Sequence, residues 1–352
     1  MFAEYARVAS IAFFAALILV PVARRLALLW GAVDQPNARK VHDHPMPRLG
    51  GIGIWAAFLL GITMTVGWDR QTAAIASAAT ILTLVGALDD RFSLPAKWKF
   101  AVQLFAAVVV VAFGVHIDKL SWIGGPVELP FWLAAILTVG WIVTITNAIN
   151  LIDGLDGLAA GVSGIATATI FAVDVAVGSS SIALVLCAAL FGAIVGFLPY
   201  NWHPARLFMG DSGSLTIGFL VAVFSVLGTT KAATTVSVVV PLLILGVPIF
   251  DTLTAVVRRA IWRRPIFQPD KMHLHHQLLA LGLSHRQVVL TIYGVCAVLG
   301  GGAVALTYLS TSLGTAIVAT LFVGLLIAAD KVGLRPVPLQ QPGAQFPAPP
   351  GK

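Results

Sequence analysis

Charged residues are scarce along this chain. Aspartate, glutamate, lysine and arginine make up 11% of its 352 residues, whereas a soluble domain carries about 25%. Hydrophobic residues make up 58%, and mostly apolar stretches of roughly eighteen residues or more recur throughout. This composition excludes a soluble globular domain. It predicts an all-α fold, a polytopic membrane bundle that forms a single domain over residues 1–331.

Cysteine is nearly absent too. Cys187 and Cys296 both lie inside apolar runs, so we expect two buried small side chains and no disulfide framework. Apolar periodicity is missing from the last segment, residues 332–352, which contains six prolines. We expect this segment to be a disordered tail.

The apolar runs predict about eleven spans. They lie near residues 8–30, 49–67, 72–88, 98–115, 130–149, 157–175, 181–198, 213–229, 235–257, 288–307 and 312–330. Loops on one side hold 18 of the 22 lysines and arginines. The positive-inside rule places these loops and the C-terminus in the cytoplasm and the N-terminus outside. The net charge of +7 therefore reflects membrane topology, and we expect no nucleic-acid partner.

Aspartates recur at the predicted cytoplasmic ends of the spans. They lie in the segments 88–90, 150–157, 209–214 and 250–251. A carboxylate beside lipid is costly and usually functional, and several converging carboxylates suit a hard divalent cation and a phosphorylated ligand. For Asp89 and Asp90 alone, an ordinary interface marker is an equally good interpretation. Lys97 and Lys99 follow closely and favour a site where Mg²⁺ and phosphate meet.

The segment from Asn147 to Gly157 gives the strongest local signal. Asn147 and Asn150 share a helix face, and Asp153 and Asp156 share it if the helix continues. The glycines in this segment alternatively mark a tight turn that allows the backbone to approach a ligand. An aspartate-capped turn explains one of these carboxylates, but not two carboxylates and two amides.

Two more segments have both a structural and a functional interpretation. Asp211 and Ser212 precede an apolar run, so they either cap a helix or help its N-terminus to hold an anion. The basic stretch 258–264 suits ordinary membrane anchoring, but His273, His275 and His276 beside it favour an anion or metal site. We prefer hydrogen bonds to diphosphate, because no zinc-type spacing occurs here. The first loop, residues 34–51, is either a solvated connector or a phosphate-contacting rim.

Taken in order, these segments resemble the polyprenyl-phosphate N-acetylhexosamine-1-phosphate transferases, of the glycosyltransferase family 4 type. The similarity extends over about residues 34–290. It rests on the ordered set Asp89-Asp90, Asn147-x-x-Asn150-x-x-Asp153-Gly154-Leu155-Asp156-Gly157, Gly210-Asp211-Ser212-Gly213-Ser214 and His273-Leu274-His275-His276. The resemblance implies transfer of a sugar 1-phosphate from a UDP-sugar to undecaprenyl phosphate, with release of UMP. It also implies a Mg²⁺ cofactor, with Mn²⁺ as a substitute.

The resemblance also implies roles for individual residues. Asp211 and Asn150 match metal ligands, and Asp89, Asp90 and Asp153 match catalytic carboxylates. Substrate-binding positions are matched near the lipid phosphate, the uridine and the diphosphate by Lys40, Lys99, Asp156, Asn201, Phe208, Arg259, His273, His275 and His276. The implied setting is the bacterial inner membrane, with the site facing the cytoplasm; a homodimer is left open.

The histidine motif favours the GlcNAc-1-phosphate branch of the family. Gln277 departs from it, because many members of this branch have a basic residue there. The phospho-MurNAc-pentapeptide transferases are therefore an alternative. A secondary transporter of anions or nucleotide sugars is a rival from another class, but it would place polar groups near mid-membrane. The aspartate spacing of CDP-alcohol phosphotransferases does not occur here.

Overall fold

The structure is a computed structural model. It describes residues 2–35, 45–65, 67–122, 125–179, 182–229, 236–263 and 272–308, together with residues 320 and 324. Lys40, the expected tail 332–352 and all but residues 320 and 324 of the expected span 312–330 lie outside these residues, so these expectations stay predictions.

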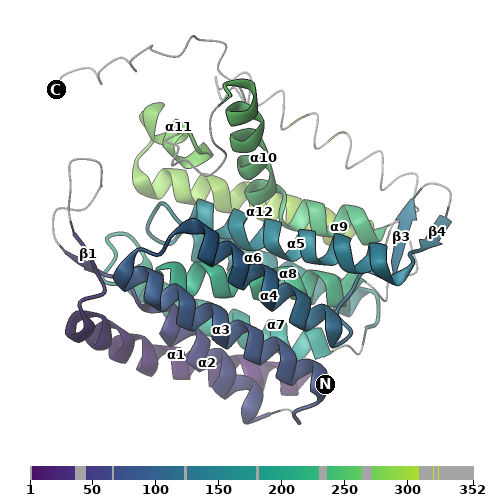
Figure 1. Cartoon of the computed structure of the whole chain (residues 1–352), viewed down its shortest axis with the longest axis horizontal. Coiled ribbons are helices and arrows are strands. Elements are labelled where there is room, and N and C mark those ends of the chain that lie inside the picture. The colour runs from purple at the N-terminus through teal and green to yellow at the C-terminus, as the bar shows by residue number, and fades with distance from the viewer. Residues whose placement is uncertain are drawn as a thin grey trace.

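Helices dominate the described residues, as the composition predicts (Figure 1). They are α1 (Phe2–Trp30), α2 (Gly50–Thr63), α3 (Arg70–Phe92), α4 (Ala96–Ala112), α5 (Phe131–Ile152), α6 (Leu158–Ala176), α7 (Ile182–Asn201), α8 (Asp211–Thr229), α9 (Val236–Ile244), α10 (Gly246–Ile261), α11 (Leu274–Ala280) and α12 (His285–Leu306). Two short antiparallel ribbons accompany them. They pair β1 (Val33–Asp34) with β2 (Met46–Pro47), and β3 (Lys119–Trp122) with β4 (Gly125–Glu128).

Seven of the described helices are long and apolar enough to cross a membrane. They are α1, α3, α5, α6, α7, α8 and α12. Helix α2 is apolar but has only 14 residues, and α4 has 17. The structure is therefore that of a polytopic helical membrane protein, while the count of eleven spans and the orientation of the termini stay predictions.

One expected span is not a single helix. The run over 235–257 is divided at Leu245 into α9 and α10. Gly246 weakens a helix at this point, and Pro248 has no N–H to donate to the carbonyl of Ile244. As a result α10 turns away from α9 and rises from the bundle beside α11 (Figure 1).

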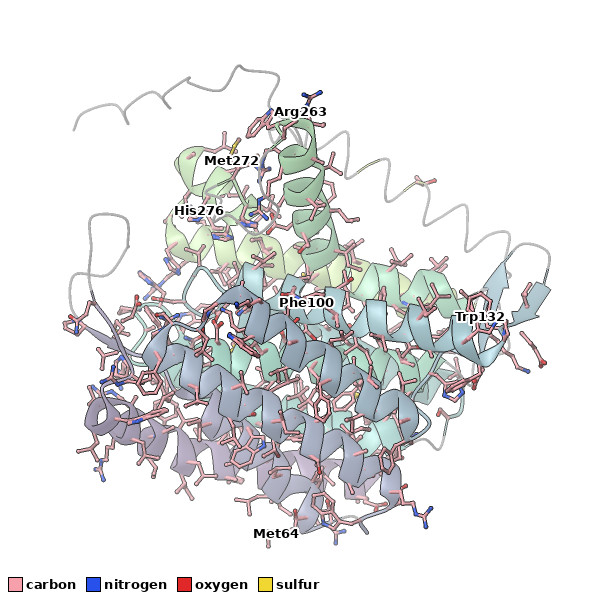
Figure 2. All side chains as sticks on the ribbon, viewed as in Figure 1. Met64, Phe100, Trp132, Arg263, Met272 and His276 are labelled. Carbon is pink, nitrogen blue, oxygen red and sulfur yellow. The ribbon has the colours of Figure 1, made fainter. Side chains whose placement is uncertain are left out.

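Helix α8 lies at the centre of the bundle and α1 at its rim. Of the apolar window in α8, 94% is buried, against 28% in α1. Helices α2, α3, α5, α6 and α7 all contact α8. Large apolar side chains such as Met64, Phe100 and Trp132 instead face outward (Figure 2), as expected for a surface in contact with lipid.

Two glycines bring other helices close to the first turn of α8. A Cβ atom at Gly51 would lie 2.0 Å from the backbone nitrogen of Gly213, and one at Gly86 would lie 2.5 Å from the carbonyl oxygen of Asp211. Small residues allow such close approach of membrane helices. Both contacts hold α2 and α3 against the residues with which α8 begins.

Candidate active site

Three of the four predicted aspartate segments, 88–90, 150–157 and 209–214, lie at one end of the bundle, whereas Asp251 lies within α10 and binds His273. At that end of the bundle α3 ends, α4 begins, α5 ends and α8 begins, while the N-terminus and the β3–β4 ribbon lie at the other end (Figure 1). Four helix termini therefore surround one site, built from residues that are far apart in sequence.

The turn between α3 and α4 positions Asp89 and Lys99. Ser93 ends α3 with a positive φ of 53°, which reverses the chain. One oxygen of Asp89 accepts the backbone N–H of Leu94 at 2.7 Å, and the other lies 3.2 Å from Nζ of Lys99. Asp89 is thus fixed by its own turn and faces a cation on the next helix.

Asp211 joins this pair from α8. Its Oδ2 lies 2.8 Å from Nζ of Lys99, and its Oδ1 accepts a hydrogen bond from Nδ2 of Asn150 at 3.2 Å. The same amide donates to the hydroxyl of Ser214 at 2.8 Å. The two residues that the resemblance assigns to the metal are therefore in direct contact, and the lysine assigned to the lipid phosphate touches one of them.

Asp90 has a different environment from its neighbour. It is 6% exposed, and its two oxygens accept the backbone N–H groups of Asp211 and Ser212 at 2.8 and 3.0 Å. Nε of Arg48 lies 3.6 Å from it. Asp90 therefore caps α8 from another helix. Its predicted catalytic role stays a prediction, and the geometry adds a positioning role.

The turn after α5 contains Asp153. Burial, followed by the nearby charge of Asp211, raises the pKa of Asp153 to about 7. The backbone N–H of Asp153 bonds the carbonyl of Asn150 at 3.4 Å. Asp153 thus lies beside the Asn150–Asp211 pair and titrates near neutral pH.

Asp156 and Asn201 bind protein groups on the adjoining loop. Asp156 accepts hydrogen bonds from the Ala205 backbone at 3.0 Å and from Nδ1 of His203 at 2.8 Å. Asn201 accepts the N–H of Gly157 and donates to the carbonyl of Leu207, both at 3.0 Å. These contacts hold the turn of α5–α6 against the end of α7.

Phe208 connects this loop to the first turn of α2. Its N–H donates to the carbonyl of Pro47 at 2.9 Å, and its carbonyl accepts from Gly50 at 3.0 Å. The phenyl ring is partly exposed. Phe208 therefore lies next to the site, and its contact with uridine stays a prediction.

The histidine motif is more buried than its predicted contact with diphosphate suggests. His273 and His275 are 6% and 2% exposed. Asp251 binds Nδ1 of His273 at 2.9 Å and accepts the N–H of Leu274 at 2.7 Å. A Cβ atom at Gly154 would lie 2.4 Å from Nε2 of His275, so the motif packs directly on the turn after α5.

The charge of His275 follows from this burial. Desolvation, followed by the neighbouring His276, lowers the pKa of His275 to about 3. The ring is therefore neutral at physiological pH, and it can assist an anion by hydrogen bonding rather than by charge. His276, on α11, is less buried (Figure 2). Arg259 is buried in α10.

Similarity to known proteins agrees with this geometry. Residues 72–229 match glycosyl transferase family 4. Over 321 residues the chain is 44% identical to a protein of Bacillus subtilis (strain 168) named "Probable undecaprenyl-phosphate N-acetylglucosaminyl 1-phosphate transferase", with 90% of this chain and 89% of the relative covered. The chain belongs to glycosyl transferase family 4.

Two other relatives of this family 4 member are similar over most of their length. "Decaprenyl-phosphate N-acetylglucosaminephosphotransferase" of Mycolicibacterium smegmatis is 38% identical over 343 residues, which cover 86% of this chain and 83% of the relative. "Undecaprenyl-phosphate alpha-N-acetylglucosaminyl 1-phosphate transferase" of Salmonella typhi is 33% identical over 300 residues, which cover 83% of this chain and 81% of the relative.

The oxygen donors of this family 4 site fit a Mg²⁺ ion. Mg²⁺ prefers oxygen ligands, and the carboxylates of Asp89 and Asp211 both turn an oxygen toward the ammonium group of Lys99. A cationic group already lies between them. Asn150 now presents its NH₂ group, and a half-turn of the amide would present its carbonyl oxygen instead.

Sequence reasoning missed two contacts of the family 4 site. Arg48 belongs to the first loop, residues 34–51, yet it approaches Asp90 at the start of α8. Gln103, one turn beyond Lys99, exchanges hydrogen bonds with Asn147 at 2.5 and 3.4 Å. A buried glutamine in an apolar span was the available signal, because such an amide needs a partner.

Proposed function

We propose that this chain transfers N-acetylglucosamine 1-phosphate from UDP-GlcNAc to undecaprenyl phosphate and releases UMP. This reaction would be the first membrane step in making a cell-envelope polysaccharide. The names of the three relatives support the polyprenyl phosphate acceptor and the GlcNAc-1-phosphate group.

One observation carries the proposal. Asp89, Lys99, Asn150 and Asp211 come from four helices and meet through direct contacts of 2.8 to 3.2 Å. A purely structural ion pair needs one acid and one base. Two carboxylates, an ammonium and an amide at the membrane boundary instead suit two anionic phosphates that must approach each other.

The chemistry is a phosphoryl transfer, in which positioning and charge neutralisation dominate. An oxygen of the lipid phosphate forms a bond to the β-phosphorus of the UDP-sugar. The bond from that phosphorus to the oxygen bridging the two phosphates breaks, and UMP leaves with the electron pair. We infer direct displacement without a covalent phospho-aspartate; trapping a labelled enzyme–phosphosugar adduct would overturn this inference.

The residues of the site have separate roles in this proposed reaction. A Mg²⁺ ion held by Asp211 and Asn150 would neutralise charge that develops on the leaving phosphate. Lys99 neutralises the lipid phosphate and positions it for attack. Asp89 orients Lys99, and Asp153, with a pKa of about 7, accepts a proton from an acceptor phosphate that arrives protonated.

The donor would extend from this cluster over the turn after α5. Asp156, Asn201 and Phe208 are proposed beside the uridine, and Arg259 and His276 beside the diphosphate. The remaining predicted substrate contacts are Lys40, His273 and His275. Because His273 and His275 are buried, they contribute mainly by supporting the turn from which the ligand is held.

We place the site on the cytoplasmic face of a bacterial inner membrane. The bias of basic loops supports this orientation. UDP-sugars are cytoplasmic donors, and the phosphate of a polyprenyl phosphate lies at the membrane surface. Both substrates then meet at the end of the bundle where α3 and α5 end and α8 begins.

The direct test is incorporation of label from UDP-[¹⁴C]GlcNAc into butanol-extractable lipid. Purified protein, undecaprenyl phosphate and Mg²⁺ should suffice, and chelation by EDTA should stop the reaction. Asp211→Asn should abolish turnover while the protein stays folded, because the side-chain volume barely changes. Near-normal activity of this variant would remove Asp211 from the metal site.

A matched control lies at the other end of the bundle. Asp118 is exposed there beside His116, and Asp118→Asn should retain full activity. A panel with UDP-MurNAc-pentapeptide and other UDP-HexNAc donors separates the branches of the family. If no donor supports transfer while the protein binds nucleotide sugar, a transporter becomes the better explanation.

A further inference from the structure

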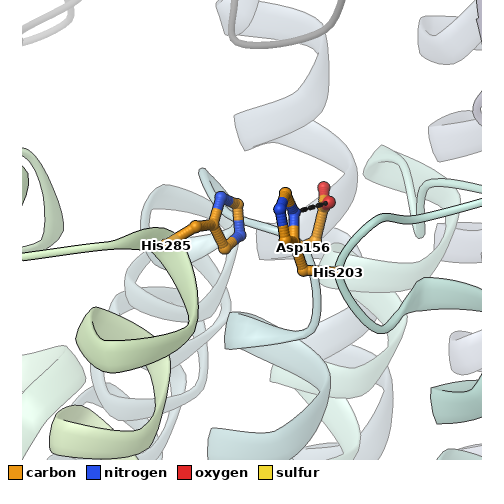
Figure 3. Close-up of side chains that lie close together, drawn as sticks. All are labelled: Asp156, His203 and His285. Atoms are coloured by element: carbon orange, nitrogen blue, oxygen red, sulfur yellow. Dashed lines mark hydrogen bonds and ion pairs between the residues drawn. The ribbon is translucent and has the colours of Figure 1, made fainter.

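Three side chains beside the proposed catalytic cluster form a second group with metal-binding chemistry. They are Asp156 in the turn between α5 and α6, His203 in the loop after α7, and His285 at the first position of α12 (Figure 3). One ligand atom from each lies within 4.8 Å of the other two. The three come from segments that are far apart in sequence.

The contacts inside this group are already partly organised. Nδ1 of His203 lies 2.8 Å from an oxygen of Asp156. The ring of His285 stacks on that of His203, with centroids 4.1 Å and planes 17° apart. Neighbouring bonds fix the frame, since Ala205 donates to Asp156 and Arg286 donates to the carbonyl of His203 at 3.1 Å.

His285 supplies an independent observation. Both of its ring nitrogens are buried, and neither makes a hydrogen bond of good geometry within the described part of the chain; the backbone of Asp156 lies close to the ring. A neutral imidazole has one nitrogen that donates a hydrogen bond and one that accepts, and burying either without a good partner is costly. A ligand that takes up a nitrogen lone pair would remove this cost.

The geometry points to a transition-metal site formed by Asp156, His203 and His285, with Zn²⁺ as the ion that fits best. Two imidazoles and one carboxylate are the ligand set of open zinc sites. They differ in kind from the oxygen donors around Asp211, which suit Mg²⁺. The protein would thus hold two different metals at adjacent places, selected by ligand chemistry.

Closing the site requires two local movements. Ligand atoms of a tetrahedral zinc lie about 3.3 Å apart, given bonds of about 2.0 to 2.2 Å. The His285 ring must therefore leave the stack and move inward by up to about 1.5 Å, and the His203–Asp156 pair, which is 2.8 Å apart, must open by about 0.5 Å. His285 is the first residue of α12, where helix ends adjust readily, and its capping residue Ser284 stays in place.

The consequence would be a clamp between α12 and the wall of the active site. Tyr293 of α12 already donates to the carbonyl of Gly157, so the metal would strengthen an existing junction. The loop with His203 leads directly into α8, and the turn with Asp156 also contains Asp153. The inference concerns metal binding and does not depend on the proposed transfer reaction.

Binding to the purified full-length protein tests the site directly. Protein stripped with chelator is titrated with Zn²⁺ by calorimetry in excess Mg²⁺, and Co²⁺ serves as an optical probe. We expect one tight zinc equivalent, a tetrahedral Co²⁺ spectrum, and a higher melting temperature with zinc. His203→Gln and His285→Gln should each weaken zinc binding at least tenfold. Wild-type protein that binds no zinc overturns the proposal, even if a variant fails to fold.

Three control variants locate the ion. His116→Gln alters a histidine–aspartate pair at the other end of the bundle, Asp211→Asn alters the oxygen site, and His276→Gln alters the neighbouring histidine motif. All three should keep the zinc equivalent. Loss of zinc in His276→Gln together with retention in His285→Gln would assign the ion to the histidine motif and contradict the proposal. X-ray absorption that finds no imidazole ligands would also contradict it.

Discussion

Both carboxylate oxygens of Asp90 are occupied by the backbone of Asp211 and Ser212, at 2.8 and 3.0 Å. Asp90 therefore fixes the first turn of α8, on which the proposed metal ligand Asp211 sits. Gly210 completes this arrangement, because its φ is +71° and a Cβ atom there would lie 2.0 Å from the carbonyl oxygen of Arg48. Adjacent aspartates thus have different surroundings, since Asp89 faces Lys99.

Asp90→Asn should weaken Mg²⁺ binding more than it slows turnover. The amide keeps one acceptor but turns an NH₂ group toward a backbone donor and loses the charge that faces Arg48. We expect the Mg²⁺ concentration for half-maximal activity to rise about tenfold, or about 1.4 kcal/mol, and stability to fall by about 1 to 3 kcal/mol. Turnover at saturating Mg²⁺ should largely recover. A variant that stays folded but is inactive at every Mg²⁺ concentration would instead make Asp90 catalytic.

Asp69 offers the matched control for this experiment. It caps α3, accepting the backbone N–H of Thr72 at 2.7 Å, at the end of the bundle away from the site. Asp69→Asn should lower stability by a similar mechanism and leave the Mg²⁺ dependence unchanged. Equal changes in Mg²⁺ dependence in both variants would show that the effect is global.

The sequence predicted most of the helices and the gathering of the aspartates. Long apolar runs locate helices because every backbone group in a membrane must be satisfied locally. Once Asp89, Asn150 and Asp211 were assigned to ends of spans on the same side, their proximity followed from topology. The histidine motif was expected beside them, and His275 does contact the turn at Gly154.

Pairings across the bundle were not predictable in the same way. Asp90 and Ser212 are separated by 122 positions, and no local pattern says that one caps the other. The break at Leu245 was missed for another reason: Gly246 and Pro248 mark it in the sequence, but the apolar run continues across it. His203 looks unremarkable in sequence because its partners Asp156 and His285 come from other segments.

Lys99→Gln should tighten Mg²⁺ binding and lower turnover. The ammonium lies between Asp89 and Asp211 at 3.2 and 2.8 Å, so it competes with a metal for the same oxygens. Removing it leaves two carboxylates that favour a cation more strongly, yet removes the positive charge proposed for the acceptor phosphate. Calorimetric titration measures the affinity for Mg²⁺, and the label-incorporation assay measures turnover. Weaker Mg²⁺ binding would show that Lys99 organises the carboxylates rather than competing.

The amide pair between α4 and α5 should couple stability to site geometry. Gln103 is 3% exposed, and its exchange of hydrogen bonds with Asn147 lies one turn from Lys99 and Asn150. Gln103→Leu alone leaves Asn147 with an unmet bond and should cost about 1 to 3 kcal/mol. Adding Asn147→Leu should restore part of that loss, which a double-mutant cycle of melting temperatures measures. Strictly additive losses would show that the pair is not coupled.

Asp153 should make stability fall as pH rises toward neutrality. Burial, together with the charge of Asp211, raises the folded-state pKa of Asp153 to about 7, above the value of about 3.9 in an unfolded chain. A raised pKa means that the folded state holds the proton more tightly, so the stabilisation is complete below about pH 4 and is lost by about pH 7. Melting temperatures measured in EDTA from pH 5 to 8 should therefore decline for the wild type.

Asp153→Asn removes this titration and should flatten that part of the pH profile. Asp118→Asn is an exposed control that should leave the profile unchanged.

The pH dependence of turnover separates the effect of Asp153 on stability from its effect on catalysis. If ionised Asp153 accepts a proton from the acceptor phosphate, wild-type turnover rises with pH through the range in which its carboxyl ionises, opposite in sign to the change in stability. Saturating Mg²⁺ should move the rise to lower pH, because a nearby cation favours the carboxylate. A wild-type turnover profile that falls over this range would exclude Asp153 as the proton acceptor.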